Sequence, residues 1–338
     1  MKRVIWQKKI SFLLAAVLVM TLCSCHSSTV TENTTEEGKT AETLLSSGAD
    51  TDTEAESETE AETEVEYPYD FTDPDFFKID GWELCLPWAA INGVTAEGKY
   101  FQLKTVDGYA VMQGACSDGT YMYALLENKG IFVDGEKRSY CMLFKIDLAT
   151  WEIVAQSEGL PVDHGNGLTY NSNTNQLVVA HCQRLTKGVS FIDPETLTVI
   201  DTIEIDRAIT SITYNDIRDQ YVIMVKGTRD FAILDADFNE VAYYTGVETG
   251  LSNQNISCDD DYIYLLHTGT NSNFSGVEVF LCFDWEGNYC GAYRLKNYSE
   301  VEALIHVNGT VYASFYTSGG RFYRLNFDES LRKSTSTN

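Results

Sequence analysis

The chain has 338 residues, of which 44% are apolar and 12% aromatic, enough to build at least one hydrophobic core. Its formal net charge of -26 argues against a nucleic-acid partner, because an acidic surface repels phosphate backbones instead of neutralising them. Its one long apolar run lies at the N-terminus, which excludes a protein that crosses the membrane with several helices.

The first 24 residues have the layout of a secretion signal. Basic residues including Lys2 and Arg3 precede an apolar stretch, 10–22, that is too short to span a bilayer as a helix. It ends in Leu22-Cys23-Ser24-Cys25, which resembles the lipobox of bacterial lipoproteins. The resemblance implies that Cys25 is lipidated and that the protein is extracytoplasmic, surface-exposed and anchored to the bacterial cell membrane. An ordinary cleaved signal without a lipid is the alternative.

Residues 25–66 differ sharply in composition from the rest. They are rich in Ser, Thr, Ala and Glu, contain no aromatic residue and carry a single base, Lys39. Such a segment cannot bury enough apolar surface to fold, so we predict a disordered acidic stalk. An acidic tract that binds cations or a partner is the alternative. Residues 67–98 are predicted as an N-terminal extension packed by Trp82 and Trp88, and 331–338 as a disordered tail.

From residue 107 onward one phrase recurs: an apolar strand that ends in Asp, a tight turn and a second strand. The strand of this phrase covers 143–147, 189–193, 231–235, 279–284 and, with Asn326 in place of Asp, 322–326. Each copy follows another predicted hairpin, with turns such as Asp118-Gly119 and Asn308-Gly309. Four antiparallel strands in a unit of about 45 residues are typical of a β-propeller blade.

The number of blades follows from the two ends of the repeat region. The last repeat supplies three strands before the chain ends, and the segment 99–106 precedes the first complete repeat. That segment is the natural fourth strand of the last blade. We therefore predict an all-β fold, a propeller of five four-stranded blades over 99–330, closed by this N-terminal strand. Six blades are possible if 67–98 contains a degenerate unit.

The repeats resemble the YVTN, NHL and gluconolactonase-like group of bacterial propellers. The resemblance is clearest in Asn166-Gly167-Leu168-Thr169-Tyr170-Asn171 followed by Val178-Val179-Ala180, and it covers 99–327. It is specific for the fold and weak for the activity, because propellers host many unrelated functions.

A candidate site follows from the repeat. The first strand of a propeller blade starts near one mouth of the central channel, and the second strand returns to that mouth. One equivalent position is polar in all five repeats: Gln113, Asn166, Thr210, Gln254 and Glu302. The second strands bring His181 and His267 to the same end, and His164 lies just before Asn166. Such a ring suits hydroxyl, carboxylate or peptide groups of a ligand. A water-filled polar lining without a ligand is the alternative for the ring. For His181 and His267 the alternative is that each is hydrogen-bonded to its own neighbours.

The predicted loops at this mouth are long and carry many of the basic residues: Lys129, Lys137, Arg138, Arg184, Lys187, Arg207, Arg229 and Arg321. In an acidic domain this segregation favours an anionic ligand or partner at the mouth. Scattered solubilising charge is the alternative explanation.

Two enzyme families were tested against these positions. Gluconolactonase-like propellers hold a divalent metal with Glu, Asn and Asp, and Asn166 matches their Asn. Gln113 and Thr210 stand where the acids are expected, which leaves Glu302 and Asp163 as nearby replacements and metal occupancy undecided. Gln113-Gly114 resembles the opening phrase of plant-type glutaminyl cyclases. However, Asn166 stands where that family carries Glu, and a neutral amide cannot take a proton as a carboxylate can.

The cysteines do not indicate a disulfide scaffold. Seven follow Cys25, an odd number without framework spacing. Cys282 and Cys290 flank one predicted hairpin and are the pair that could be cross-strand neighbours.

The sequence thus predicts a surface-anchored, non-catalytic, monomeric binding module. Its channel mouth would recognise a glycan, a small metabolite or an envelope protein. The alternative is a propeller hydrolase, lactonase-like or cyclase-like, with substituted active-site residues that use Glu302 with His164. No cofactor is assigned, and a divalent metal in the channel is left open.

Overall fold

The computed structural model describes residues 91–128, 130–133, 136–269, 277–296 and 299–327. Cys25, the predicted stalk, Trp82, Trp88 and the tail lie outside these ranges. Every regular element within them is a β-strand, and this part of the chain contains no helix long and apolar enough to cross a membrane.

The strands pair in antiparallel sets of four that follow the chain. The first set is β2 (Val111–Ser117), β3 (Tyr121–Glu127), β6 (Cys141–Asp147) and β7 (Ile153–Leu160). The second is β8 (Gly167–Asn171), β9 (Gln176–Ala180), β10 (Gly188–Ile192) and β11 (Val199–Glu204). The third is β12 (Ile209–Asn215), β13 (Gln220–Val225), β14 (Phe231–Leu234) and β15 (Glu240–Tyr244).

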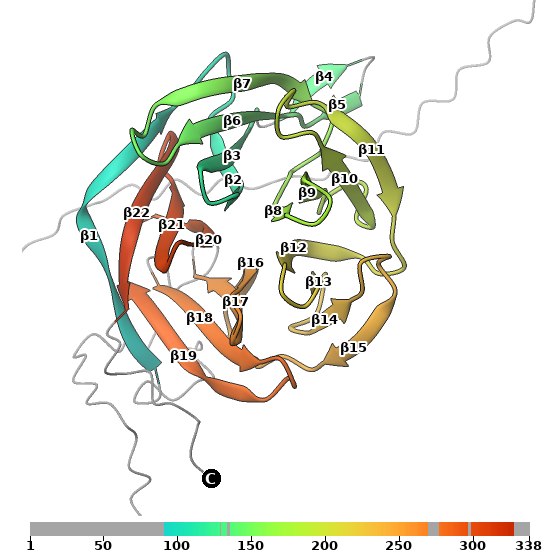
Figure 1. Ribbon diagram of the computed structural model, residues 1–338, viewed down its shortest axis with the longest axis vertical. Coiled ribbons are helices and arrows are strands. Elements are labelled where there is room, and N and C mark those ends of the chain that lie inside the picture. The colour runs from blue at the N-terminus through green and yellow to red at the C-terminus, as the bar shows by residue number, and fades with distance from the viewer. Residues whose placement is uncertain (1–90, 129, 134–135, 270–276, 297–298, 328–338) are drawn as a thin grey trace, which may run out of the picture. The chain divides into compact units, whose positions relative to one another are not determined.

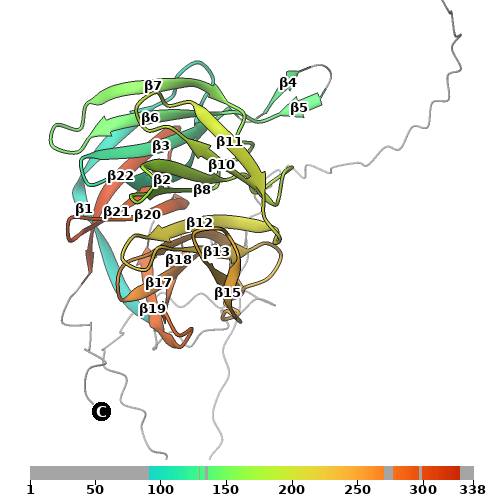
Figure 2. The same ribbon diagram turned by 45° about the vertical axis from the view of Figure 1, so that its right-hand side comes forward.

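Two further sets complete this part of the chain. The fourth is β16 (Ser252–Cys258), β17 (Tyr262–Thr268), β18 (Val277–Asp284) and β19 (Tyr289–Lys296). The last is β20 (Val301–Val307), β21 (Thr310–Tyr316), β22 (Gly319–Phe327) and the N-terminal β1 (Ile91–Lys104). A short hairpin of β4 (Ile131–Val133) and β5 (Glu136–Arg138) projects from the first set (Figure 2).

Strand β1 joins the two ends of the described chain. It pairs antiparallel with β22 from Val94 to Lys104, so the predicted pairing of 99–106 with the last repeat is present. It begins earlier than predicted, at Ile91, and its first four residues pair in parallel with β19. The boundary at residue 98 is therefore corrected: 91–98 belong to the sheet. A register shift between Ala96 and Tyr100 interrupts the strand, which is why its sequence pattern breaks there.

The hydrophobic core consists of clusters between neighbouring sets. The first and second sets share a cluster that contains Tyr123 and Leu168, the third and fourth share one that contains Phe231 and Phe283, and equivalent clusters lie at the other junctions. The last set packs on the first through Phe322. Middle strands such as β3 are mostly apolar because both of their faces are covered.

The recurring Asp at the end of each third strand has a local structural role. The Asp147 carboxylate accepts hydrogen bonds from the backbone N–H groups of Ala149 and Thr150, at 2.8 and 2.9 Å. Asp193, Asp235 and Asp284 make the same kind of turn. An Asx turn of this type stabilises the tight reversal to the outer strand. The repeated Asp therefore marks turns and not a ligand site.

Figure 1 shows the first strand of each set facing a common centre, with the fourth strand outermost. These inner strands are β2, β8, β12, β16 and β20. We call the end where they begin the mouth and the end where they finish the far end. The arrangement is propeller-like, and it decides which residues meet.

Candidate functional site

The inner strands share an irregularity at the mouth. The register shifts between Met112 and Ala115 in β2, between Ile209 and Ser211 in β12, between Asn253 and Asn255 in β16, and between Val301 and Ala303 in β20. The residues at these shifts include Gln113, Thr210, Gln254 and Glu302, and Asn166 directly precedes β8. A bulge interrupts the alternation of side chains and re-aims one of them. The five predicted ring positions thus occupy one structural place.

Three of these residues form a hydrogen-bonded chain. The Asn166 Nδ2 donates to the carbonyl oxygens of Thr210 at 3.1 Å and Gln254 at 2.6 Å. The Gln254 Nε2 donates to the Glu302 Oε2 at 2.5 Å. Residues of the second, third, fourth and last sets are therefore brought together at the mouth. The amide nitrogen of Asn166 thus ties inner strands together at the mouth.

Asn255, which sequence reasoning missed, closes this layer. Its Nδ2 donates to the carbonyl oxygens of Asn166 at 2.8 Å and Glu302 at 2.7 Å, and its Oδ1 accepts from the Ser211 Oγ at 3.1 Å. The equivalent residues of the other sets are small: Gly114, Gly167, Ser211 and Ala303. A Cβ on Gly167 would lie 2.6 Å from the Ile212 nitrogen, so the inner strands approach closely here. The sequence feature that could have identified Asn255 is that it stands at a repeated position where the other four sets have Gly, Ser or Ala.

Glu302 is the acidic member of the ring, and 2% of its surface is exposed. Burial raises the pKa of its carboxyl well above the usual range, and repulsion from Glu300, Glu278 and Glu127 adds to the effect. The hydrogen bond from Gln254 acts in the opposite direction. The environment therefore favours the neutral carboxyl, which can give or take a proton.

The other acids near Glu302 come from three different elements. Glu278, at the start of β18, is fully buried and accepts a hydrogen bond from the Thr268 hydroxyl at 2.9 Å. Burial raises the pKa of Glu278 and also that of Glu300, which His164 lowers. Glu127 ends β3, and its Oε2 lies 3.0 Å from the His164 Nδ1. The mouth thus collects four carboxyl groups and one imidazole.

Gln113 has an unusual environment for a buried amide. Its side chain is 2% exposed, and its Oε1 accepts no hydrogen bond from the described residues. Strand β2 contacts β8 on one side and β20 on the other, which places Gln113 between Asn166 and Glu302 in the ring. The Glu278 Oε2 is likewise buried without a hydrogen-bond partner in the described part. Buried polar atoms of this kind are rare and call for an explanation.

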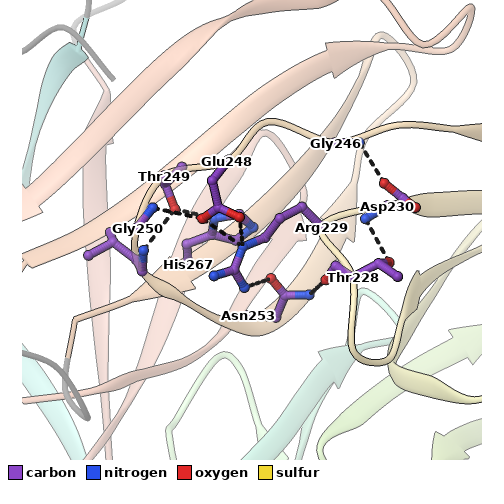
Figure 3. A network of polar contacts seen from close by, with 10 residues as sticks. Thr228, Arg229, Asp230, Gly246, Glu248, Thr249, Gly250, Asn253 and His267 are labelled. Atoms are coloured by element: carbon purple, nitrogen blue, oxygen red, sulfur yellow. Dashed lines mark hydrogen bonds and ion pairs between the residues drawn. The ribbon is translucent and has the colours of Figure 1, made fainter. Parts of the chain in front are cut away.

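The structure does not bring His181 and His267 together as facing ligands. The His181 Nε2 lies 2.7 Å from the Ser190 Oγ of its own set, and burial lowers its pKa. The His267 Nδ1 lies 2.7 Å from the Thr249 Oγ1, and burial, with a smaller contribution from Arg229, lowers its pKa to about 3. Figure 3 shows His267 in this network. Both imidazoles are therefore held by neighbouring hydroxyl groups. Their positions at strand ends could be predicted from the repeat, but the directions of the side chains could not.

The basic residues that predicted an anionic ligand are partly neutralised. Arg229 binds the Glu248 carboxylate and donates to the Asn253 Oδ1 at 2.7 Å, as Figure 3 shows. Together with Thr210 these residues line a cavity of about 310 Å³. Arg207 is paired with Glu240. These two arginines are thus paired with acids, while the buried polar side chains of the mouth include Glu127, Glu278 and Glu302.

The far end of the inner strands also has a cavity, of about 500 Å³. The turns of several sets line it, and they contribute Asp118, Asp216, Asp259 and Asp260 with His306. Asp118 and Asp259 are occupied by hydrogen bonds within their own turns.

The predicted replacements for metal ligands have other partners. The Asp163 carboxylate accepts backbone hydrogen bonds from Gln183 at 3.0 Å and Arg184 at 2.6 Å. Among the described residues, no group of three or more His, Cys, Asp or Glu side chains is arranged to hold a metal ion. Cys282 faces Gly291 and not Cys290 across its hairpin.

Comparisons with known proteins add evidence on the fold. No family model matches the chain, and no curated protein matches it. The crystal structure of Myxococcus xanthus glutaminyl cyclase is similar with a TM-score of 0.50 and 12% identity, over 70% of this chain and 97% of that one. Kuenenia stuttgartiensis hydrazine synthase has a TM-score of 0.39 and 12% identity over 63% of this chain and 57% of that one. The likeness to the cyclase supports a propeller-like all-β fold and extends no further.

Proposed function

We propose that this protein is a five-bladed β-propeller whose mouth binds a small ligand outside the cytoplasm. The inner strands contact one another in the cycle β2, β8, β12, β16, β20 and back to β2, and β1 supplies the fourth strand of the last set. Both features support a closed ring of five blades. In this proposal Cys25 carries the lipid anchor and the acidic stalk holds the monomeric ring away from the membrane.

The observation that carries the binding function is the buried, unpartnered amide of Gln113. A buried polar atom without a hydrogen bond costs about 1–3 kcal/mol, a cost that a purely structural lining would avoid. Gln113 lies in the same ring as Glu302 and Asn166, so a ligand at the mouth can supply the missing hydrogen bond. A glycan or a small polar metabolite has the required hydroxyl or amine groups.

The binding function is tested by thermal unfolding of the full chain against a panel of envelope glycans and polar metabolites. A ligand at one hundred times its dissociation constant raises the stability of the folded state by about 2.7 kcal/mol. We expect at least one compound to raise Tm in the wild type and to lose this effect in Gln113→Met. Gln176→Met, at the start of β9, is the matched control and keeps the response. An effect that Gln113→Met leaves intact would place the ligand elsewhere.

A cyclase-like enzyme is the second candidate, and the carboxyl of Glu302 is the observation that favours it. The fold neighbour is a glutaminyl cyclase, and the ring of this chain has an acid in the last set where the second set has Asn166. In such a reaction the α-amine nitrogen of a terminal glutamine attacks its side-chain carboxamide carbon. The new C–N bond forms, ammonia leaves, and Glu302 would carry the proton from the amine to the leaving nitrogen.

This candidate is tested by ammonia release from a peptide that begins with glutamine. If the wild type releases ammonia and Glu302→Gln does not, the protein is an enzyme and not a non-catalytic binding module. The same peptide without protein controls for spontaneous loss of ammonia, and an asparagine-initiated peptide, whose cyclisation would need a four-membered ring, controls for release of ammonia by simple hydrolysis. No release above the rate without protein would leave the binding function as the better account.

A further inference from the structure

We propose that the mouth recognises an organic primary ammonium group, which the oxygen atoms of Gln113, Glu278 and Glu302 surround. The inference rests on the proposed binding function and names the chemistry of the ligand. It reverses the expectation from the loop charges, which favoured an anion.

The first argument is a mismatch between acceptors and donors. The Oε1 of Gln113 and the Oε2 of Glu278 have no hydrogen-bond partner among the described residues, although their side chains are 2% and 0% exposed. The Gln113 Oε1 is an acceptor, and the Glu278 Oε2 is one when its carboxyl is ionised, so a ligand that satisfies both must bring donors. A primary ammonium group brings three N–H donors on one compact cation and can therefore serve acceptors from more than one strand.

The second argument is charge. Glu127, Glu300 and Glu278 all lie close enough to Glu302 to repel its ionised form, and they come from β3, the loop before β20, and β18. His164, beside Glu127, is the basic group that faces them. Four acids around one imidazole form a site for positive charge, because a cation relieves the repulsion between carboxylates. A phosphate or carboxylate ligand would increase it.

The third argument concerns the size of the guest. The acids are spread over three elements around a polar ring whose Gln113 amide also points to a larger, hydrogen-bonded guest. Amines on a carbon skeleton, such as amino sugars and diamines, meet both conditions.

The proposal also predicts a linkage to protons. In the free protein, burial raises the pKa of Glu302, Glu278 and Glu300, and repulsion from neighbouring acids adds to the effect for Glu302 and Glu278. A bound ammonium group stabilises their ionised forms and lowers these pKa values again. Binding near neutral pH therefore releases protons to the solvent.

The test is calorimetric titration of the full chain with two matched pairs of probes. Cadaverine is compared with the diol of the same length, and glucosamine with N-acetylglucosamine. In each pair we expect the compound that carries the amine to bind and the neutral compound not to bind. Glu302→Gln should weaken binding about tenfold or more, as expected for the loss of a charge-assisted hydrogen bond. Glu286→Gln, an exposed acid in the turn after β18, is the control and should leave the affinity within about twofold.

Proton release gives a second readout that a merely structural role of Glu302 would not produce. The heat of binding should differ between buffers of high and low ionisation enthalpy, and Glu302→Gln should reduce the difference. Glu300→Gln, at a half-buried position, repeats the test if Glu302→Gln does not fold.

The outcomes separate this inference from the binding function. If the neutral compounds bind equally well, recognition of an ammonium group is wrong, but the proposal that the mouth binds a ligand remains. Stabilisation by calcium ions alone, lost in Glu302→Gln, would assign an inorganic cation and also overturn it. Binding of none of the four probes would overturn it too, and the glycan screen with Gln113→Met would then decide the binding function separately.

Discussion

Asp118 at the far end and Glu302 at the mouth are both acids of the innermost layer, yet their surroundings differ in kind. Asp118 accepts the backbone N–H groups of Thr120 and Tyr121 and the hydroxyl of Tyr123, at 2.7 to 2.9 Å. Asp259 repeats the arrangement with Tyr264. At the mouth, buried acids repel one another, and the amide of Gln113 lacks a partner. Satisfied acids maintain the fold, whereas unsatisfied ones are candidates for function.

The largest effect is expected at the far end. Asp118→Ala removes three hydrogen bonds and leaves the hydroxyl of Tyr123 without its acceptor, so the free energy of unfolding should fall by about 3 kcal/mol. Denaturant unfolding measures the change. Asp216→Ala, an exposed acid that lines the same cavity, is the control and should stay within about 0.5 kcal/mol. Equal effects of the two variants would contradict a structural role for Asp118.

The second effect concerns the residue that closes the mouth layer. Asn255→Ala removes two hydrogen bonds to inner-strand carbonyl groups and one from the Ser211 hydroxyl. We expect a loss of about 2 kcal/mol in the free energy of unfolding. Asn253→Ala, two residues earlier on the same strand and half-buried, also loses hydrogen bonds, but these lie at the more open Arg229 network. A smaller loss is expected there, and the reverse order would be inconsistent with Asn255 as the central tie.

The third prediction is a dependence of stability on pH. The pKa values of Glu302 and Glu278 are raised in the folded state, so the unfolded chain ionises first as pH rises. The two neutral carboxyls therefore make their full contribution to the free energy of unfolding below the unfolded pKa of Glu, about 4.3. This contribution is lost as pH rises toward the pKa values of the folded state. The slope is at most about 1.4 kcal/mol per pH unit for each group. Glu302→Gln should flatten it in unfolding experiments from mildly acidic to neutral pH, and an unchanged slope would count against the buried acid.

The smallest effect has the opposite sign. Gln113→Met replaces an unsatisfied amide by an apolar side chain of similar size, so the ligand-free protein should gain about 1 kcal/mol. Gln254→Met breaks the hydrogen bond to Glu302 and should lose a similar amount. Thermal unfolding of both variants compares the two amides of one ring. A loss in Gln113→Met would show that its amide already has a structural task.

Much of this arrangement could be predicted from the repeat. Apolar strands, Asp turns and the equivalence of the five polar positions all follow from periodicity, because each set solves the same packing problem. The direction of a side chain does not follow, since one bulge reverses it. For this reason Gln254 faces Glu302, whereas His267 turns to Thr249 inside its own region.

The composition of the mouth was harder to predict. Glu278 starts a third strand and Glu300 stands in a connection, so neither occupies the repeated position that indicated the site. They reach Glu302 only through the tertiary arrangement. The early start of β1 was missed for a related reason: the register shift after Ala96 breaks the alternation that identifies a strand. Local patterns predict elements well, but convergence of separate elements requires the fold.

The pairing of β1 with β22 also sets an order of events during synthesis. The Gln102 side chain donates to the Gly320 carbonyl oxygen, a partner 218 residues later in the chain. Such a contact pays a large loop-closure entropy before it contributes any stability, and contacts of this kind form slowly. A nascent chain that has not yet reached β22 has a complete β1 with no antiparallel partner, an open edge that another strand could join. Among the described strands, the last to be made is thus the one that protects the first.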